Sequence, residues 1–73
     1  MVDTSPEMKI LLNGQPYPLR PESSVADLLH LLEVSGKRIA VELNGDIVSR
    51  ARFADTTLSP MDRVEIVHAI GGG

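Results

Sequence analysis

The chain has 73 residues, a length that allows one small domain and leaves little core in which to enclose a deep substrate pocket. Ten Asp and Glu residues against seven Lys and Arg give a formal net charge of −3, which argues against a nucleic-acid binder held by phosphate contacts. There is no Cys, so disulfides, thiolate metal sites and side-chain thiol nucleophiles are excluded. We therefore expect a cytoplasmic single domain that is not an enzyme by itself, with no metal site, no nucleic-acid partner and no membrane segment.

The first predicted element is a β-hairpin. An apolar run at 8–12 is followed by an Asn-Gly pair at 13–14, which supplies the positive φ values of a tight turn. The return strand at 15–20 carries Pro16 and Pro18 two residues apart, so both can face the unpaired side of an edge strand.

The next pattern predicts an amphipathic helix over about residues 24–35. Ser24 is the expected N-cap, and Asp27 three residues later completes a capping-box pattern. Gly36 is the expected residue just beyond the helix end. The apolar stripe that would face the core comprises Val25, Leu28, Leu29 and Leu32.

A second hairpin follows the helix. Residues 39–43 alternate, and an Asn-Gly pair at 44–45 turns the chain into a short return strand at 47–48. Residues 49–55 show no alternation and predict a helical turn or an irregular crossover anchored by Phe53.

The last predicted strand, at 63–70, follows a turn at 59–62 and turns Val64 and Ile66 toward the helix. The order hairpin, helix, hairpin, crossover and strand predicts an α+β fold of the β-grasp type. In this fold one main helix packs on one face of a mixed sheet.

The chain ends in a run of three glycines, Gly71, Gly72 and Gly73. We divide it into a flexible extension at 1–7, a β-grasp domain at 8–70 and a flexible glycine tail at 71–73. A C-terminal carboxylate becomes reactive as an acyl-adenylate, and glycine keeps the end thin and extended enough to reach a buried ATP site. The alternative interpretation is a frayed end or an expression scar.

Several segments carry a resemblance to one family. They are Asn13-Gly14, 25–29, 40–48, Arg50, Phe53, Ala54, 62–67 and Gly72-Gly73. In these segments the chain resembles the ThiS family, the sulfur carriers of thiamine biosynthesis among the ubiquitin-like proteins. It departs from the family pattern at two turn positions, with Met61 where a Gly is common and Ser49 where a Pro is common.

The resemblance implies a function for the C-terminus. Gly73 would be the reactive end, adenylated by a ThiF-type activating enzyme that uses ATP and magnesium, while the carrier itself binds no cofactor. A persulfide derived from a cysteine desulfurase would convert the adenylate to a thiocarboxylate. A ThiG-type thiazole synthase would then take the sulfur into the thiazole ring. The free carrier is expected to be a monomer.

A partner surface is also predicted beside the tail. Strand alternation places Leu11, Val67 and Ala69 on the sheet face opposite the helix, where they would form one exposed apolar patch leading through Ile70 to the glycines. The alternative is that these are scattered surface residues of the ordinary kind.

Other functions remain open at this point. The small subunit of molybdopterin synthase would share the same tail chemistry. A ubiquitin-like modifier would form isopeptide bonds with lysines of other proteins. A structural β-grasp interaction module would not need Gly73 at all. The two histidines, His30 and His68, lack companion ligands in the pattern and are interpreted as surface residues.

Overall fold

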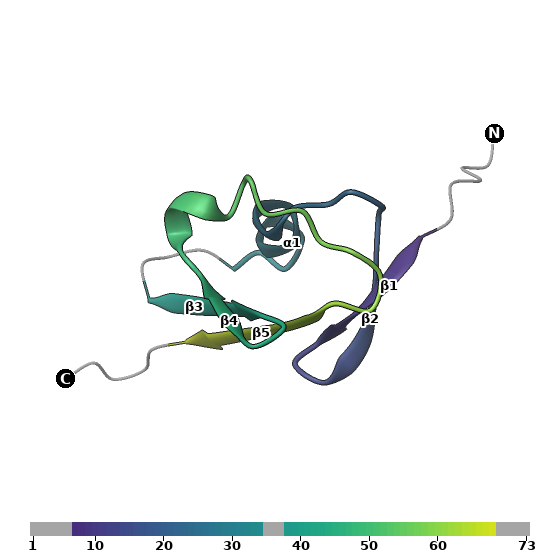
Figure 1. Cartoon of the computed structure of the whole chain (residues 1–73), viewed down its shortest axis with the longest axis horizontal. Coiled ribbons are helices and arrows are strands. Elements are labelled where there is room, and N and C mark those ends of the chain that lie inside the picture. Colours follow the sequence, from purple (N-terminus) through teal and green to yellow (C-terminus); the bar gives the residue numbers. More distant parts are fainter. Residues whose placement is uncertain (1–6, 35–37, 69–73) are drawn as a thin grey trace.

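The computed structural model describes residues 7–34 and 38–68, which form a five-stranded sheet covered on one face by a helix (Figure 1). The strand order is β2-β1-β5-β3-β4, with β1 and β5 parallel and the other pairs antiparallel. This mixed sheet with one main helix is the predicted fold. The elements are β1 (Met8–Leu12), β2 (Gln15–Leu19), α1 (Val25–Leu31), β3 (Ile39–Leu43), β4 (Asp46–Val48), the 3₁₀ turn η1 (Arg50–Arg52) and β5 (Arg63–His68).

Both hairpins turn at the predicted Asn-Gly pairs. Asn13 and Asn44 have φ values of 50° and 52°, and the glycine after each has 86° and 92°. Two consecutive left-handed residues match the right-handed twist of the flanking strands. Strand β2 lies at one edge of the sheet, which confirms the position predicted from Pro16 and Pro18.

Helix α1 begins as predicted. The Asp27 N–H donates to Ser24 Oγ at 3.1 Å, and the Ser24 N–H donates to Asp27 Oδ2 at 3.0 Å. Two backbone donors at the helix start are thereby satisfied.

The helix ends four residues before the predicted end at 35. Glu33 has a φ of 57°, its N–H donates to the carbonyl of His30 at 3.1 Å, and the N–H of Val34 donates to that of Leu29 at 3.0 Å. These bonds form a Schellman ending with Glu in the place that glycine usually takes. The backbone closes the helix without glycine, which is why the Gly36 signal misplaced the end; Gly36 itself lies outside the described residues.

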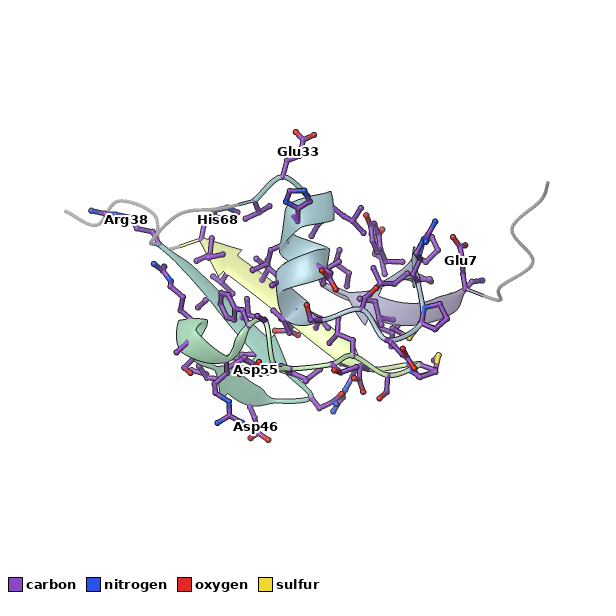
Figure 2. All side chains as sticks on the ribbon, turned by 90° about the horizontal axis from the view of Figure 1, so that it is seen from above. Glu7, Glu33, Arg38, Asp46, Asp55 and His68 are labelled. Carbon is purple, nitrogen blue, oxygen red and sulfur yellow. The ribbon has the colours of Figure 1, made fainter. Side chains whose placement is uncertain are left out.

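The core lies between α1 and the sheet, where the side chains gather in Figure 2. The predicted helix stripe and the alternating strand positions supply most of it, and Phe53 packs against it as expected. Leu58 is 2% exposed and was not predicted, because it comes from an irregular segment without periodicity. The buried apolar residues are Met8, Ile10, Leu19, Val25, Leu28, Leu29, Val41, Leu58 and Val64. No helix in the described ranges is long and apolar enough to cross a membrane.

Candidate functional site

The described part of the candidate site is the strand that leads to the glycines. Residues 69–73, which include the predicted Ala69, Ile70 and Gly73, lie outside the described residues. Strand β5 stops at His68, five residues before the end of the sequence, and runs toward the C-terminal end of the molecule in Figure 1. In the strand order it lies between β1 and β3, so the last described strand before the glycines is not one of the two outer strands of the sheet.

Strand β5 is held unequally on its two sides. Strand β3 pairs with it along its length, from Leu43 opposite Val64 to Ile39 opposite His68. Strand β1 pairs with only its first two residues, ending with Leu12 opposite Val64. Among the described strands, the half of β5 that ends at His68 therefore has a neighbour on one side only.

Two asparagine side chains extend the ladders beside β5. The backbone N–H of Asn13 donates to the Val64 carbonyl at 2.8 Å, and the side-chain oxygen Oδ1 of Asn13 accepts the backbone N–H of Ile66 at 2.9 Å. On the β3 side of β5, the backbone N–H of Asn44 donates to the Arg63 carbonyl at 2.7 Å, and the side-chain oxygen Oδ1 of Asn44 accepts the backbone N–H of Arg63 at 2.9 Å. Each asparagine thus serves both as a left-handed turn residue and as a backbone-like acceptor. The sequence analysed alone indicated only the turn role; the recurrence of Asn before Gly in both hairpins was the available signal.

The turn before β5 is fixed by Asp62. Its Oδ2 accepts the Ser59 N–H at 2.8 Å, and its Oδ1 accepts from Asn44 Nδ2 at 3.1 Å. Met61 in this turn has a φ of 67° and is 63% exposed, while its N–H donates to the Lys9 carbonyl at 2.6 Å. Met61 therefore has a left-handed backbone conformation at the position where the family commonly carries Gly.

The predicted continuous apolar patch is wrong for its described members. Leu11 is half-buried and lies opposite Arg63, whereas Val67 is 53% exposed and lies opposite Ala40 on β3. Strand β1 ends too early to reach Val67, and Glu65 comes between the two on the same face. Leu11 and Val67 are two separate apolar spots.

The centre of the open sheet face is acidic. Glu42 and Glu65 lie directly opposite each other on β3 and β5, and with Arg63 and Gly45 they line a shallow hollow of about 140 Å³. Ile47, opposite Glu42 on β4, is 73% exposed. Directly opposed like charges weaken a sheet.

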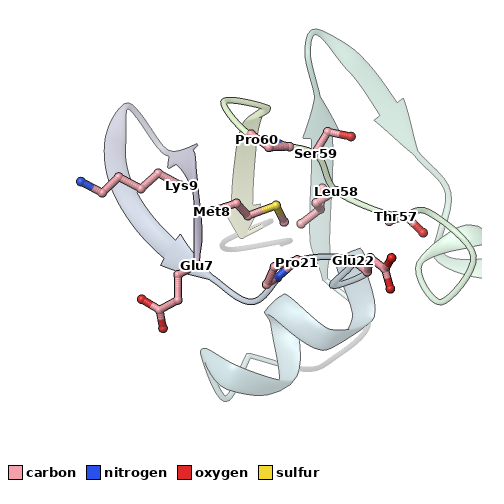
Figure 3. A pocket seen from close by; sticks show the side chains of 9 residues that line it. All are labelled: Glu7, Met8, Lys9, Pro21, Glu22, Thr57, Leu58, Ser59 and Pro60. Atoms are coloured by element: carbon pink, nitrogen blue, oxygen red, sulfur yellow. The ribbon is translucent and has the colours of Figure 1, made fainter. Parts of the chain in front are cut away.

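A larger apolar groove lies at the start of β1. It has a volume of about 620 Å³, and its buried lining residues are Met8 and Leu58 (Figure 3). The start of β1 and the end of β5 lie toward opposite ends of the molecule in Figure 1, so the groove is remote from His68, the last described residue of β5. The other residues that line this groove are Glu7, Lys9, Pro21, Glu22, Thr57, Ser59 and Pro60.

Residues 7–34 and 38–68 contain no group of three or more His, Cys, Asp or Glu side chains placed to hold a metal ion.

Comparisons with known proteins agree on one family. The model of the ThiS family matches residues 10–73. The sulfur carrier protein ThiS of Bacillus subtilis is 33% identical over 63 residues, which cover 85% of this chain and 96% of that protein. The crystal structure of the thiamine biosynthesis protein ThiS of Geobacter metallireducens has a TM-score of 0.78 and 35% identity, covering 90% of this chain and 100% of that one.

A second kind of relative is much longer. A thiazole synthase of Magnetococcus marinus is 39% identical over 66 residues, which cover 90% of this chain but 20% of that protein. This chain therefore spans about a fifth of the length of that relative.

Proposed function

This chain belongs to the ThiS family, and on that premise we propose that it carries sulfur for thiamine biosynthesis on the C-terminal carboxylate of Gly73. The observation that carries the proposal is the family match, which extends from β1 through the three glycines to residue 73. The fold supports it, because the glycines follow shortly after β5 in the sequence and the last residue of that strand, His68, is exposed. The chain is accordingly a carrier and not an enzyme.

The chemistry on the tail has three steps. A Gly73 carboxylate oxygen attacks the α-phosphate of ATP, held with magnesium by a ThiF-type enzyme, and pyrophosphate leaves. The terminal sulfur of a persulfide, formed by a cysteine desulfurase, attacks the acyl carbon and AMP leaves. A thiol then cleaves the S–S bond and frees the thiocarboxylate. The glycines contribute access to the nucleotide site, because they have no side chain to obstruct it.

The acceptor is a ThiG-type thiazole synthase. The support is that thiazole synthases of Magnetococcus marinus and Paramagnetospirillum magneticum each contain a stretch similar to this chain, at 39% and 36% identity. Sulfur transfer to the thiazole ring requires the thiocarboxylate to enter the synthase. Its acceptance by this synthase, and not by a molybdopterin synthase, separates the two carrier functions.

The acceptor is tested with carrier that has been thiocarboxylated and purified. The carrier is mixed with a thiazole synthase or with the large subunit of a molybdopterin synthase, each with its other substrates. We expect the thiocarboxylate to be consumed by the thiazole synthase only. Consumption by the molybdopterin enzyme alone would contradict the proposed pathway. Attachment of the carrier to lysines of other proteins would favour a protein modifier.

Docking on the activating enzyme is proposed to involve the apolar residues nearest the tail, Val67, Ala69 and Ile70. Val67 is exposed and is the second-last residue of β5, whereas Leu11 is half-buried and lies opposite Arg63, the first residue of β5. We expect Val67→Asp to keep the fold and weaken binding, because a charge replaces an apolar contact. We expect Leu11→Asp to lower the melting temperature instead. Titration calorimetry with the activating enzyme and thermal melts check both variants. An unchanged affinity of Val67→Asp for that enzyme would show that Val67 is not part of the docking surface.

A further inference from the structure

We propose that the tail-side half of β5 is an open sheet edge to which an extended segment of the activating enzyme adds as a further strand. The inference rests on the proposed function, since it assigns how the enzyme that adenylates Gly73 grips the carrier. It concerns the backbone of the last described residues, Ile66 and His68, and not the side chains of the open sheet face.

The hydrogen bonds of β5 show which way its backbone groups point. The Arg63 N–H and C=O bond to Asn44, on the β3 side. The Val64 carbonyl and the Ile66 N–H bond to Asn13, on the β1 side. Since these directions alternate along a strand, the Ile66 carbonyl and both backbone groups of His68 also point to the β1 side.

On that side the ladder stops. Strand pairing with β1 ends opposite Val64, and beyond that pair Asn13 Oδ1 accepts the N–H of Ile66. Within residues 7–34 and 38–68, no other strand pairs with this side of β5. Figure 1 shows β5 running on past the β1–β2 hairpin toward the C-terminal end.

The two outer edges of the sheet are poorer templates. Strand β2 carries Pro16 and Pro18, which have no N–H to offer to an added strand. Strand β4 has only three residues, Asp46–Val48. Short edges and prolines are devices that prevent unwanted strand pairing. The backbone of β5 next to the tail has neither device.

The free backbone groups of β5 and the glycines that follow indicate what kind of segment would bind this edge. Alternating N–H and C=O groups of a strand are matched by another extended backbone. The three glycines beyond His68 offer no side chains, so backbone bonds are the means by which an enzyme can orient them. The activating enzyme must draw this tail in extended form to ATP, and a strand added on β5 would fix the direction from which the tail enters.

Amide hydrogen exchange of the wild-type chain, free and saturated with the activating enzyme, tests the pairing directly. We expect the His68 N–H to exchange fast in the free chain and at least about tenfold more slowly in the complex. The Val67 N–H, directed toward β3, should already be slow in the free chain. Unprotected His68 in a complex that adenylates the carrier would overturn this inference and leave the proposed function standing.

Two further outcomes of the exchange experiment are decisive. Protection of His68 in the free chain that grows with chain concentration would assign the edge to a second copy and overturn the proposal. Failure of the enzyme to bind and adenylate the wild-type chain would overturn the proposed function and this inference with it.

Two variants separate the backbone of His68 from its side chain. His68→Pro removes the outward N–H, and β2 shows that prolines with open-side nitrogens are tolerated in an edge of this sheet. We expect an unchanged melting temperature and a KM for the carrier raised at least about tenfold. His68→Ala keeps the N–H and should raise KM much less. A wild-type KM for the proline variant, or an equal loss in the alanine variant, would contradict strand addition.

Discussion

Individual residues with left-handed backbone mark where this fold is strained. Among the residues that the structure describes, five that are not glycine have positive φ, and two of them are the turn asparagines that tolerate it. The other three are Glu22, Glu33 and Met61. Figure 2 shows the Glu33 side chain projecting away from the fold. Such positions are hard to predict, because nothing in the local sequence before Met61 or Glu33 requires φ to be positive.

Met61→Gly should stabilise the domain. Met61 is 63% exposed, so its removal loses little burial, while glycine relieves a left-handed conformation that costs other residues about 1–2 kcal/mol. The greater freedom of glycine in the unfolded chain offsets part of this gain, so we expect about 0.5–1 kcal/mol and a melting temperature higher by a few degrees. Met61→Ala is the control, since it shortens the side chain but keeps the strain. Equal melting temperatures for the two variants would show that the strain is absent.

Leu28→Ala should destabilise the whole domain. Leu28 is fully buried in the predicted helix stripe, and removal of a buried leucine side chain costs about 2–5 kcal/mol. Chemical denaturation measures the loss. Leu31→Ala, on the exposed side of the same helix, should have little effect. A denaturation midpoint for Leu28→Ala like that of the wild type would contradict the position of the core.

At the scale of elements, the parts with strong local signals were predicted correctly. Both Asn-Gly hairpins, the capping box of α1 and the alternation of β3 follow from local chemistry and were confirmed. The end of α1 and the burial of Leu58 depend on how distant segments meet. The predicted union of Leu11 with Val67 failed for the same reason, because the register and length of a parallel pair are not encoded in either strand alone.

The side chain of Asn13 should matter for β5 separately from its turn. Asn13→Gly keeps the left-handed turn but removes the oxygen that accepts the Ile66 N–H. We expect faster exchange of the Ile66 amide and a loss of about 0.5–1.5 kcal/mol in unfolding free energy. Asn13→Asp, which keeps an acceptor oxygen, is the matched control and should retain most of the protection. Unchanged Ile66 exchange in Asn13→Gly would contradict the role of this bond.

For the whole molecule, the fold and the chemistry of the tail should be separable. Pairing with β3 holds β5 in the sheet as far as His68, and the proposed reaction takes place at Gly73, five residues further along the sequence. Which partners bind, how the C-terminal carboxylate is activated and which enzyme accepts the sulfur all depend on other molecules. The sequence and the fold of this chain alone do not determine them. Family resemblance supplied that part of the prediction.

Deleting Gly73 should abolish adenylation and leave stability within about 0.5 kcal/mol of the wild type. The shortened chain still ends in a glycine carboxylate, but one extended residue spans about 3.3–3.6 Å, and a misplacement of about 1 Å can cost on the order of a hundredfold in rate. Adding an Ala after Gly73 should fail as well, because the carboxylate moves onward with a methyl group beside it. ATP–pyrophosphate exchange and thermal melts check both variants; full exchange by the truncated chain would mean that Gly73 is not the reactive residue.

The most direct test of the carrier function is the intact mass of the chain after incubation with ATP, magnesium, the activating enzyme and a persulfide donor. Omitting ATP is the control, and fragmentation locates any change along the sequence. We predict the mass gain of one oxygen replaced by sulfur, located at Gly73 and dependent on ATP. An unchanged mass with an activating enzyme that is active on its own carrier, or a sulfur located elsewhere in the chain, would contradict the account.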